Sequence, residues 1–172
     1  MNSTVKDLIT RRSVRKYKAE LPSREELMTV IEAGTYAPTG KNMQSPIIVA
    51  VTNPEEISYL SKLNAAVLGT SSDPFYGAPA VLVVLADADN YNHVYDGSLV
   101  MGNLMNAAHA IGLGSCWINR AREVFASAEG KAWLEKHGIC GNYAGIGNCI
   151  IGYPDEAPVG RPRKENYVYF VE

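Results

Sequence analysis

A short basic segment near the start of the chain has the composition of an anion site. Arg11, Arg12, Ser13 and Arg15 place three guanidinium groups and one hydroxyl within five positions. Guanidinium groups present forked donors that match the oxygens of a phosphate, and a hydroxyl can complete such a site. The spacing therefore fits a phosphate monoester, and a solvated basic turn is the alternative with the same composition.

A second basic segment lies near the other end of the chain, where Arg161, Arg163 and Lys164 occupy four positions. Together with the five basic residues of 11–18, it holds half of the 16 lysines and arginines. The net charge of −2 and the pI of 5.9 argue against a general nucleic-acid binder. A nucleic-acid module that uses residues 11–18 is therefore the least favoured function, and we expect no nucleic-acid partner.

Other kinds of chemistry have little support in the residue pattern. The histidines are far apart, no metal-ligand spacing is present, and no serine lies in a Gly-x-Ser-x-Gly turn. Gly112-Leu113-Gly114 follows a predicted helix and precedes a strand, which is the reverse of the order in a dinucleotide site. The cysteines form no Cys-x-x-Cys pair and have apolar neighbours, so we expect small buried core residues at Cys116, Cys140 and Cys149.

Capping and apolar patterns predict a single domain of mixed helices and strands. Thr4 and Asp7 indicate a first helix start, and Ser23 with Glu26 forms a capping box for a second helix that Pro38 stops. A further helix should follow Asn53. Apolar runs predict core strands at 47–51, 80–85, 115–118 and 144–151, and a helix over 122–136 with a break near Gly130.

The segment from about residue 90 to 111 predicts a helix that is apolar nearly all round, which indicates burial on more than one side. Gly97 and Gly102 in its interior each cost about 1 kcal/mol relative to alanine, and a close helix–helix approach would offset that cost. One side therefore fits an interface with a second subunit. The alternative is the central helix of a monomer core.

The last residues resemble an arm rather than part of the core. Residues 155–166 are polar and rich in proline, and the strand-prone residues 167–171 follow them. Such a segment needs a sheet edge with which to pair. The whole pattern is that of an α+β or α/β protein, and no apolar run or leader sequence suggests a membrane or export. We therefore expect no membrane partner and a cytoplasmic location.

Five motifs in order resemble the FMN-dependent nitroreductase family across essentially the whole chain. The first two are R-R-S-V-R-K-Y at 11–17 and A-P-T-G-K-N-M-Q at 37–44. The third begins at Asp96, continues through Asn103-Leu104 and Ala107-Ala108, and ends in I-G-L-G-S-C-W at 111–117. The last two are I-G-Y-P at 151–154 and R-P-R at 161–163.

This resemblance implies a three-layer α+β fold with a central, mainly antiparallel sheet flanked by helices. It implies one nitroreductase-like domain over residues 1–172, whose residues 155–172 form a domain-swapped C-terminal arm on the partner subunit. It also implies a homodimer with two FMN sites, each built from both chains.

The resemblance assigns flavin-binding roles to thirteen residues and no catalytic or metal-binding residue. The phosphate, ribityl chain and pyrimidine edge would contact Arg11, Arg12, Ser13, Arg15, Arg161 and Arg163. The partner subunit would supply Pro38, Thr39 and Asn42, with Gln44 nearby. The backbone at the flavin N5/O4 edge would be that of Leu113, Gly114 and Ser115.

The implied activity is that of an NAD(P)H-dependent flavin oxidoreductase. A hydride passes from NADH or NADPH to FMN, and a small electron-poor acceptor such as a nitroaromatic or quinone then takes the same place in a ping-pong cycle. Two alternatives stay open. One is a non-catalytic flavin-binding protein, and the other is a different flavin enzyme of this fold, a dehydrogenase or a dehalogenase.

Overall fold

A computed structural model describes all residues, 1–172, as four strands and six α-helices with one 3₁₀ turn. In chain order the elements are α1 (Ser3–Thr10), α2 (Arg24–Thr35), the 3₁₀ turn η1 (Gly40–Asn42), β1 (Pro46–Val51), α3 (Pro54–Leu68), β2 (Ala80–Asp87), α4 (His93–Ala110), β3 (Gly114–Ile118), α5 (Ala121–Ala126), α6 (Ala128–Lys136) and β4 (Tyr143–Gly152). No helix is both long enough and apolar enough to cross a membrane.

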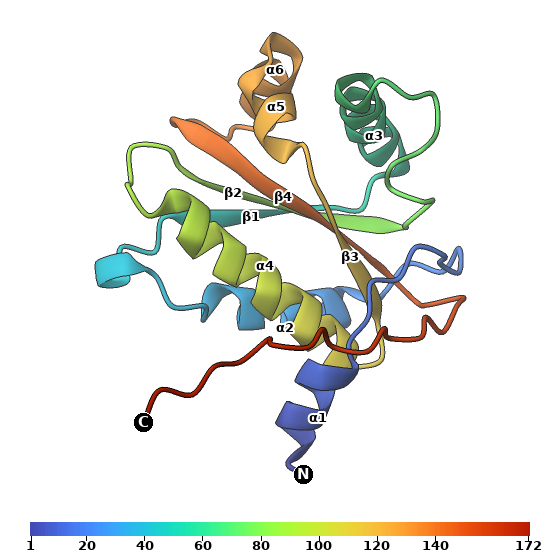
Figure 1. The fold of residues 1–172 in the computed structure, drawn as a ribbon. Coiled ribbons are helices and arrows are strands. Elements are labelled where there is room, and N and C mark those ends of the chain that lie inside the picture. The colour runs from blue at the N-terminus through green and yellow to red at the C-terminus, as the bar shows by residue number, and fades with distance from the viewer.

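One antiparallel sheet in the order β1-β2-β4-β3 forms the middle layer. Figure 1 shows α3, α5 and α6 over one face of this sheet and α2 and α4 over the other. The expected three-layer α+β fold with an antiparallel sheet is therefore confirmed. The two outer strands are β1 and β3, so only these strands have an edge that no other strand covers.

The central strand β2 explains why one chain forms two cores. Successive side chains of a strand point to opposite faces. Val81, Val83 and Leu85 pack with α3, α5 and α6, whereas Leu82 and Val84 pack with α2 and α4. Each of these five side chains is fully buried. Because helices cover both faces of β2, residues on both faces need apolar side chains. This explains the uninterrupted apolar run in the sequence of the strand.

A bulge in β4 explains the two glycines that flank Ile146. Val84 pairs with Gly147 and Leu85 pairs with Gly145, so Ile146 is an extra residue in the ladder. A side chain at Gly97 of α4 would lie 2.5 Å from Ile146 Cγ1. The glycine in this helix therefore allows a close approach to the sheet rather than to another helix, and we correct the sequence expectation for Gly97 accordingly.

Three local expectations were wrong. The first helix begins after Asn2, whose side chain accepts from Thr4 N, so Thr4 is not the N-cap. The break between the last two helices lies at Ser127, which caps α6, so Gly130 is inside α6. A Cβ at Gly130 would lie 2.0 Å from the Val124 carbonyl oxygen, which explains the glycine at this position. Cys140 is exposed, because it lies in the turn between α6 and β4.

Candidate functional site

The basic segment at residues 11–17 runs along the edge of β3. Val14 N donates to the Ser115 carbonyl oxygen at 3.0 Å, and Ser13 forms a parallel bridge with Ser115. Val14 is buried, which fixes the segment against the end of the sheet. The residues with anion-binding chemistry are therefore anchored by their apolar neighbour and by the backbone of β3.

A pocket of about 300 Å³ lies where this segment meets the turn between α4 and β3. It brings together five of the residues that the sequence singled out, namely Arg11, Arg12, Leu113, Gly114 and Ser115. The remaining wall comes from the end of α4 and from the start of the C-terminal tail, including Glu156. Two segments that are far apart in the sequence thus share one pocket.

Two polar groups on the pocket wall have no partner within the chain. Arg11 Nη1 and Ser115 Oγ are buried from solvent and make no hydrogen bond. A buried donor without a partner is costly, so such groups indicate a ligand, a bound water or an ion. A guanidinium nitrogen and a hydroxyl from two residues of the same pocket are donors of the kind that a phosphorylated ligand needs.

The start of the tail is tied to the basic segment by a small ladder. Lys18 N donates to the Tyr153 carbonyl oxygen at 2.9 Å, and Asp155 N donates to the Lys16 carbonyl oxygen at 2.9 Å. Lys16 Nζ and Asp155 Oδ2 also form an ion pair of 2.8 Å. The hydrogen bond and the charge attraction raise the pKa of Lys16 and lower the pKa of Asp155.

Tyr17 lies on the core side of this ladder, where it packs against the hydrophobic core. Its hydroxyl donates to the Val14 carbonyl oxygen at 2.6 Å, and burial raises the pKa of Tyr17 well above its ordinary value. The neutral phenol therefore serves as a structural hydrogen-bond donor at neutral pH. The Tyr17 hydroxyl therefore holds the backbone of Val14 in place and does not supply protons.

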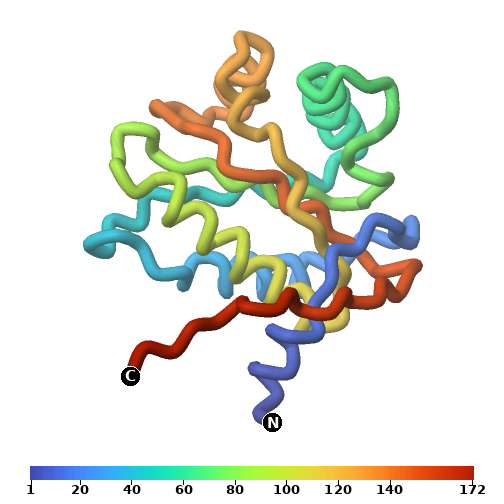
Figure 2. The backbone as a smooth tube through the Cα atoms, in the orientation of Figure 1, coloured from blue at the N-terminus to red at the C-terminus, as the bar shows by residue number.

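The second basic segment begins beside the first, as Figure 2 shows for the crossing of the tail over residues 10–15. A Cβ at Gly160 would lie 2.2 Å from Arg12 Nη2, so the tail passes directly over the Arg12 guanidinium. Arg161 is the next residue, and its carbonyl oxygen accepts from Arg163 Nη2 at 3.0 Å. Arg161 and Arg163 are both exposed here.

Arg15 lies outside the residues that line this pocket. Its backbone N–H donates to Glu156 Oε1 at 2.5 Å, and its guanidinium lies over the ring of Tyr76. The sequence reasoning missed Glu156, and it named Tyr76 only as the end of a segment, 68–76, that could cover the site. No sequence signal marks the contacts of these two residues with Arg15, since they depend on where the tail and the 69–79 loop cross the basic segment.

The remaining predicted residues lie at the other end of the molecule. Pro38, Thr39, Asn42 and Gln44 belong to the loop between α2 and β1, whose Gly40 N donates to Asp96 Oδ1 at 2.9 Å. Asp96 is in the first turn of α4, and the pocket lies beyond the last turn. At a rise of 1.5 Å per residue these places are about 20 Å apart, so one chain does not bring all the predicted residues together.

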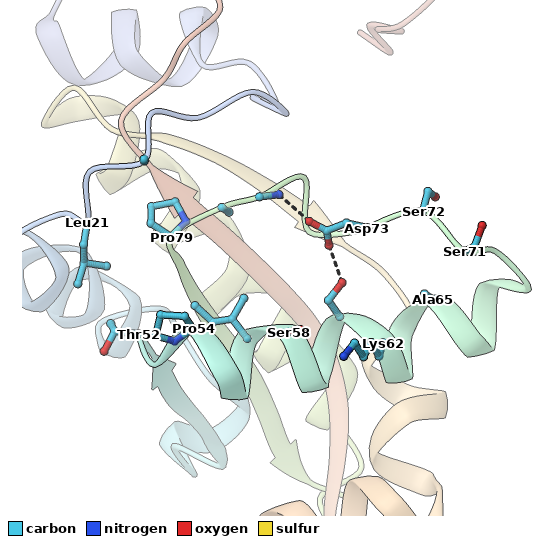
Figure 3. Close-up of a pocket in the computed structure, with 15 residues that line it drawn as sticks. Leu21, Thr52, Pro54, Ser58, Lys62, Ala65, Ser71, Ser72, Asp73 and Pro79 are labelled. Carbon is cyan, nitrogen blue, oxygen red and sulfur yellow. Dashed lines mark hydrogen bonds between the residues drawn. The ribbon is translucent and has the colours of Figure 1, made fainter.

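A larger cavity of about 640 Å³ lies between α3 and the 69–79 loop (Figure 3). Lys62 and several hydroxyls face it, and its acidic residue Asp73 is already used by its own loop. The carboxylate of Asp73 accepts from Ser61 Oγ, Phe75 N and Gly77 N. None of the predicted flavin-binding residues lines this cavity.

Known proteins resemble this chain in sequence and in fold. The nitroreductase family profile matches residues 8–73. A protein from Archaeoglobus fulgidus that is assigned as an NADH dehydrogenase/NAD(P)H nitroreductase is 30% identical over 162 residues, which cover 91% of this chain and 88% of that protein. An NADPH-flavin oxidoreductase from Vibrio harveyi is 27% identical over 179 residues, or 98% of this chain and 72% of that protein. The crystal structure of a nitroreductase with bound FMN from Desulfitobacterium hafniense matches with a TM-score of 0.90 and 25% identity over 100% of both chains.

Proposed function

The chain belongs to the nitroreductase family, and we propose that it is an FMN-dependent oxidoreductase that takes electrons from NAD(P)H. The acceptor would be a small electron-poor molecule such as a nitroaromatic or a quinone. The relatives named as an NADPH-flavin oxidoreductase and an NAD(P)H nitroreductase, and the FMN-bound structure, support this activity.

The observation that carries the proposal is the pair of unpartnered groups in the pocket between residues 11–15 and β3. Arg11 Nη1 and Ser115 Oγ are buried in a wall that also contains Arg12, and Gly160 brings the second basic segment beside it. A phosphate monoester would satisfy Arg11 Nη1, and a polar atom at the flavin N5/O4 edge would satisfy Ser115 Oγ, because the Ser115 backbone would face that edge. The near-neutral net charge of −2 fits a local anion site better than a surface for polyanions.

Each predicted contact then has a defined task. The phosphate and ribityl chain of FMN would be held by Arg11, Arg12, Ser13, Arg161 and Arg163. Arg15 would place a positive charge at the pyrimidine edge, where it stabilises the negative charge that reduction adds. The backbone of Leu113, Gly114 and Ser115 would face the N5/O4 edge. When bound, FMN supplies the hydride chemistry, so no side chain of this protein needs to act as an acid or base.

A homodimer is part of the proposal, because α4 has an apolar face that this chain leaves uncovered. Val94, Tyr95 and Leu99 are exposed on α4, and a Cβ at Gly102 would meet no atom within 4 Å. No contact within the chain explains the glycine at 102, in contrast to Gly97. Burial of this face against a second copy would explain why a residue without a side chain lies there.

The two ends of α4 explain how such a dimer would complete the flavin site. Two copies related by a two-fold axis across α4 place the start of one helix beside the end of the other. The 38–44 loop, at the start of α4, would then approach the pocket of the partner subunit. Pro38, Thr39, Asn42 and Gln44 would contact FMN there.

The end of the C-terminal arm, residues 155–172, would be exchanged in this dimer, while Asp155, Glu156 and Gly160 keep their contacts with the basic segment of their own chain. Its residues 167–171 form no strand and are exposed. The edge of β3 is already covered by residues 13–14, so β1 is the strand whose edge is free. We place the arm of each subunit along β1 of its partner as an added strand, on a single domain of residues 1–172.

We also propose a cytoplasmic location for this enzyme. Its three cysteines are all free thiols, and Cys140 is exposed. Free thiols persist where the surroundings are reducing, and NAD(P)H is available in the same compartment. Separation of a cell lysate into cytoplasmic, periplasmic and membrane fractions, followed by antibody detection, tests this location.

The function is tested by the absorbance spectrum of the bound flavin and then by the rate of NAD(P)H oxidation. Purified protein mixed with FMN should show a shifted flavin spectrum after gel filtration. Without air, NADH or NADPH should reduce the bound flavin once, and continuous oxidation should require an acceptor such as menadione. Bound flavin without NAD(P)H oxidation would indicate the non-catalytic alternative. Failure to retain or bind FMN at all would contradict the proposal.

A further inference from the structure

The loop that precedes β1 is held in an unusual backbone conformation. Lys41, Asn42 and Gln44 have φ values of 54°, 56° and 50°, a left-handed region that residues other than glycine rarely adopt. Within the loop, Gln44 N donates to Thr39 Oγ1 at 3.1 Å, and Gln44 Nε2 donates to Asn42 Oδ1 at 3.1 Å. A loop with this much backbone strain persists only where its surroundings fix it.

The contact that fixes the loop from outside is a buried carboxylate of α4. Asp96 is 3% exposed, and its Oδ1 accepts from Gly40 N at 2.9 Å. Its Oδ2 is buried and has no partner. Burying a charged group with an incomplete set of partners is costly, so the position of Asp96 calls for a reason beyond the stability of this single chain.

Neighbouring residues hold the same loop at both ends. A Cβ at Gly40 would lie 2.2 Å from Asn92 Nδ2, so the loop passes directly over the start of α4. At the other end, Asp87 N donates to the Ser45 carbonyl oxygen at 3.4 Å. Asp87, Asn92 and Asp96 therefore hold the 38–45 loop, and Asp96 is the charged side chain among these contacts.

Helix capping is the ordinary role of an acidic residue in a first turn, and it does not account for this contact. The N-cap of α4 is Asn92, and no side chain caps the helix there. The hydrogen bond of Asp96 goes to another segment rather than to an N–H of α4. The carboxylate is thus directed toward the loop.

We propose that Asp96 is a positioning residue for the flavin site of the partner subunit. Through Gly40 it holds the 38–44 loop in the left-handed conformation that presents Asn42 and Gln44 to that site. Asp96 itself does not touch the flavin in this arrangement. This inference rests on the proposed function, since it requires that the loop contacts FMN across a dimer.

The test compares the FMN dissociation constant of the wild-type protein with that of Asp96→Ala and Asp96→Asn, measured by quenching of FMN fluorescence. We expect Asp96→Ala to raise the constant about tenfold. Asp96→Asn keeps an acceptor for Gly40 N but not the charge, and should raise it about threefold. The matched control is Asp89→Asn, the same change at a carboxylate that accepts from Asn142 Nδ2 instead of from the loop.

A double-mutant cycle separates positioning from general stability. Asn42→Ala should weaken FMN binding in the wild type and have a much smaller further effect in Asp96→Ala, because the loop is already displaced. All constants are measured at a temperature where circular dichroism shows each variant folded and sedimentation shows it dimeric. Additive effects of the two changes, or an unchanged constant in Asp96→Ala, would overturn the inference.

Two further outcomes are informative. Dissociation of the Asp96→Ala dimer would assign Asp96 to the interface and would also overturn the positioning role. If the wild type itself does not bind FMN, the proposed function fails, whereas tight wild-type binding with no effect of Asp96 contradicts this inference alone. The visible circular dichroism of bound FMN, which reports the asymmetry of its surroundings, should change in Asp96→Ala and not in Asp89→Asn.

Discussion

The guanidinium carbon of Arg15 lies 6.0 Å from the centre of the Tyr76 ring. This distance is at the outer limit of a cation–π contact. Tyr76 has a φ of 54°, and the loop that carries it is anchored by the buried side chain of Phe75 and by the hydrogen bonds of Asp73. The loop therefore presents Tyr76 to Arg15, a predicted flavin contact that does not line the pocket between residues 11–15 and β3.

Arg15→Ala should weaken FMN binding about tenfold to a hundredfold or slow flavin reduction, because a charged hydrogen-bonding group at the pyrimidine edge is lost. The dimer should stay folded, since only the backbone N–H of Arg15 bonds to Glu156. Fluorescence quenching gives the affinity, and stopped-flow absorbance gives the rate. Lys18→Ala is the control, as it removes a charge from the same segment. Unchanged flavin content and unchanged NAD(P)H oxidation would contradict the role.

Tyr76→Leu should weaken FMN binding about twofold to fivefold, which corresponds to the loss of one exposed cation–π contact. Tyr76→Phe keeps the aromatic face and should bind FMN as the wild type does. The same fluorescence titration measures both variants. Equal affinities for the leucine and phenylalanine variants would show that the ring does not hold Arg15.

Deletion of residues 167–172 should weaken the dimer, because these residues have no core of their own and are exposed in the single chain. Sedimentation velocity over a series of concentrations should show a larger monomer fraction at each one. Deletion of Glu172 alone is the control, since it leaves the strand-prone residues in place. A truncated protein with an unaltered dimer would contradict the exchanged arm.

Local patterns predicted much of the fold, because each depends on residues close in sequence. The capping box is one case: Glu26 N donates to Ser23 Oγ, and Ser23 N donates to Glu26 Oε2. The fully buried strand β2 is another, since its apolar run has no polar alternation. Asn53 likewise caps α3 through Glu55 N and Glu56 N.

The site was less accessible to such reasoning, because its geometry depends on where distant segments cross. The family resemblance implied that the two basic segments meet, and Gly160, the residue before the second segment, lies on Arg12. It contained no signal for Glu156, whose position follows from the ladder between the tail and residues 16–18. The break at Ser127 was also missed, since the close packing of Gly130 on Val124 appears only when α5 and α6 are in place.

The three cysteines should differ in their reaction with iodoacetamide. Cys149 and Cys116 are buried, and burial raises the pKa of Cys149 to about 12, so little thiolate forms there at pH 8. Cys140 is exposed and should be the residue modified in the native protein. Mass spectrometry of peptides after brief labelling tests this, with labelling in urea as the control. Rapid native labelling of Cys149 would contradict the buried position.

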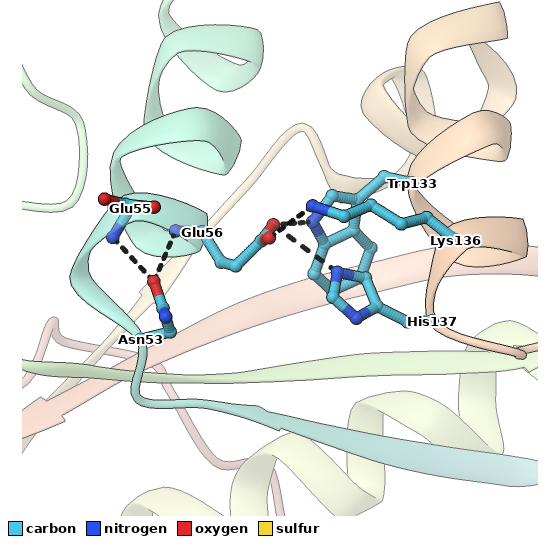
Figure 4. Close-up of polar contacts among 6 residues, drawn as sticks. All are labelled: Asn53, Glu55, Glu56, Trp133, Lys136 and His137. Atoms are coloured by element: carbon cyan, nitrogen blue, oxygen red, sulfur yellow. Dashed lines mark hydrogen bonds and ion pairs between the residues drawn. The ribbon is translucent and has the colours of Figure 1, made fainter.

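Glu56 joins α3 to α6 through a cluster shown in Figure 4. Its carboxylate accepts from Lys136 Nζ at 2.5 Å and from Trp133 Nε1 at 2.6 Å, and His137 Nε2 lies 3.4 Å away. The hydrogen bond from Lys136, followed by that from Trp133, lowers the pKa of Glu56 from 4.5 to about 2. The charged carboxylate is therefore favoured in the folded state.

A pKa that is lower in the folded state stabilises the protein above the unfolded pKa, and this contribution is lost as the pH falls toward the folded value. Stability should therefore decrease as the pH falls from about 4.5 to about 2, and Glu56→Gln should remove part of that decrease because it cannot be protonated. Urea unfolding at pH 6, 4 and 3 measures the effect. Glu55→Gln is the control, since Figure 4 shows the Glu55 side chain directed away from α6. Equal pH dependence in Glu56→Gln and the wild type would show that this cluster does not contribute to acid unfolding.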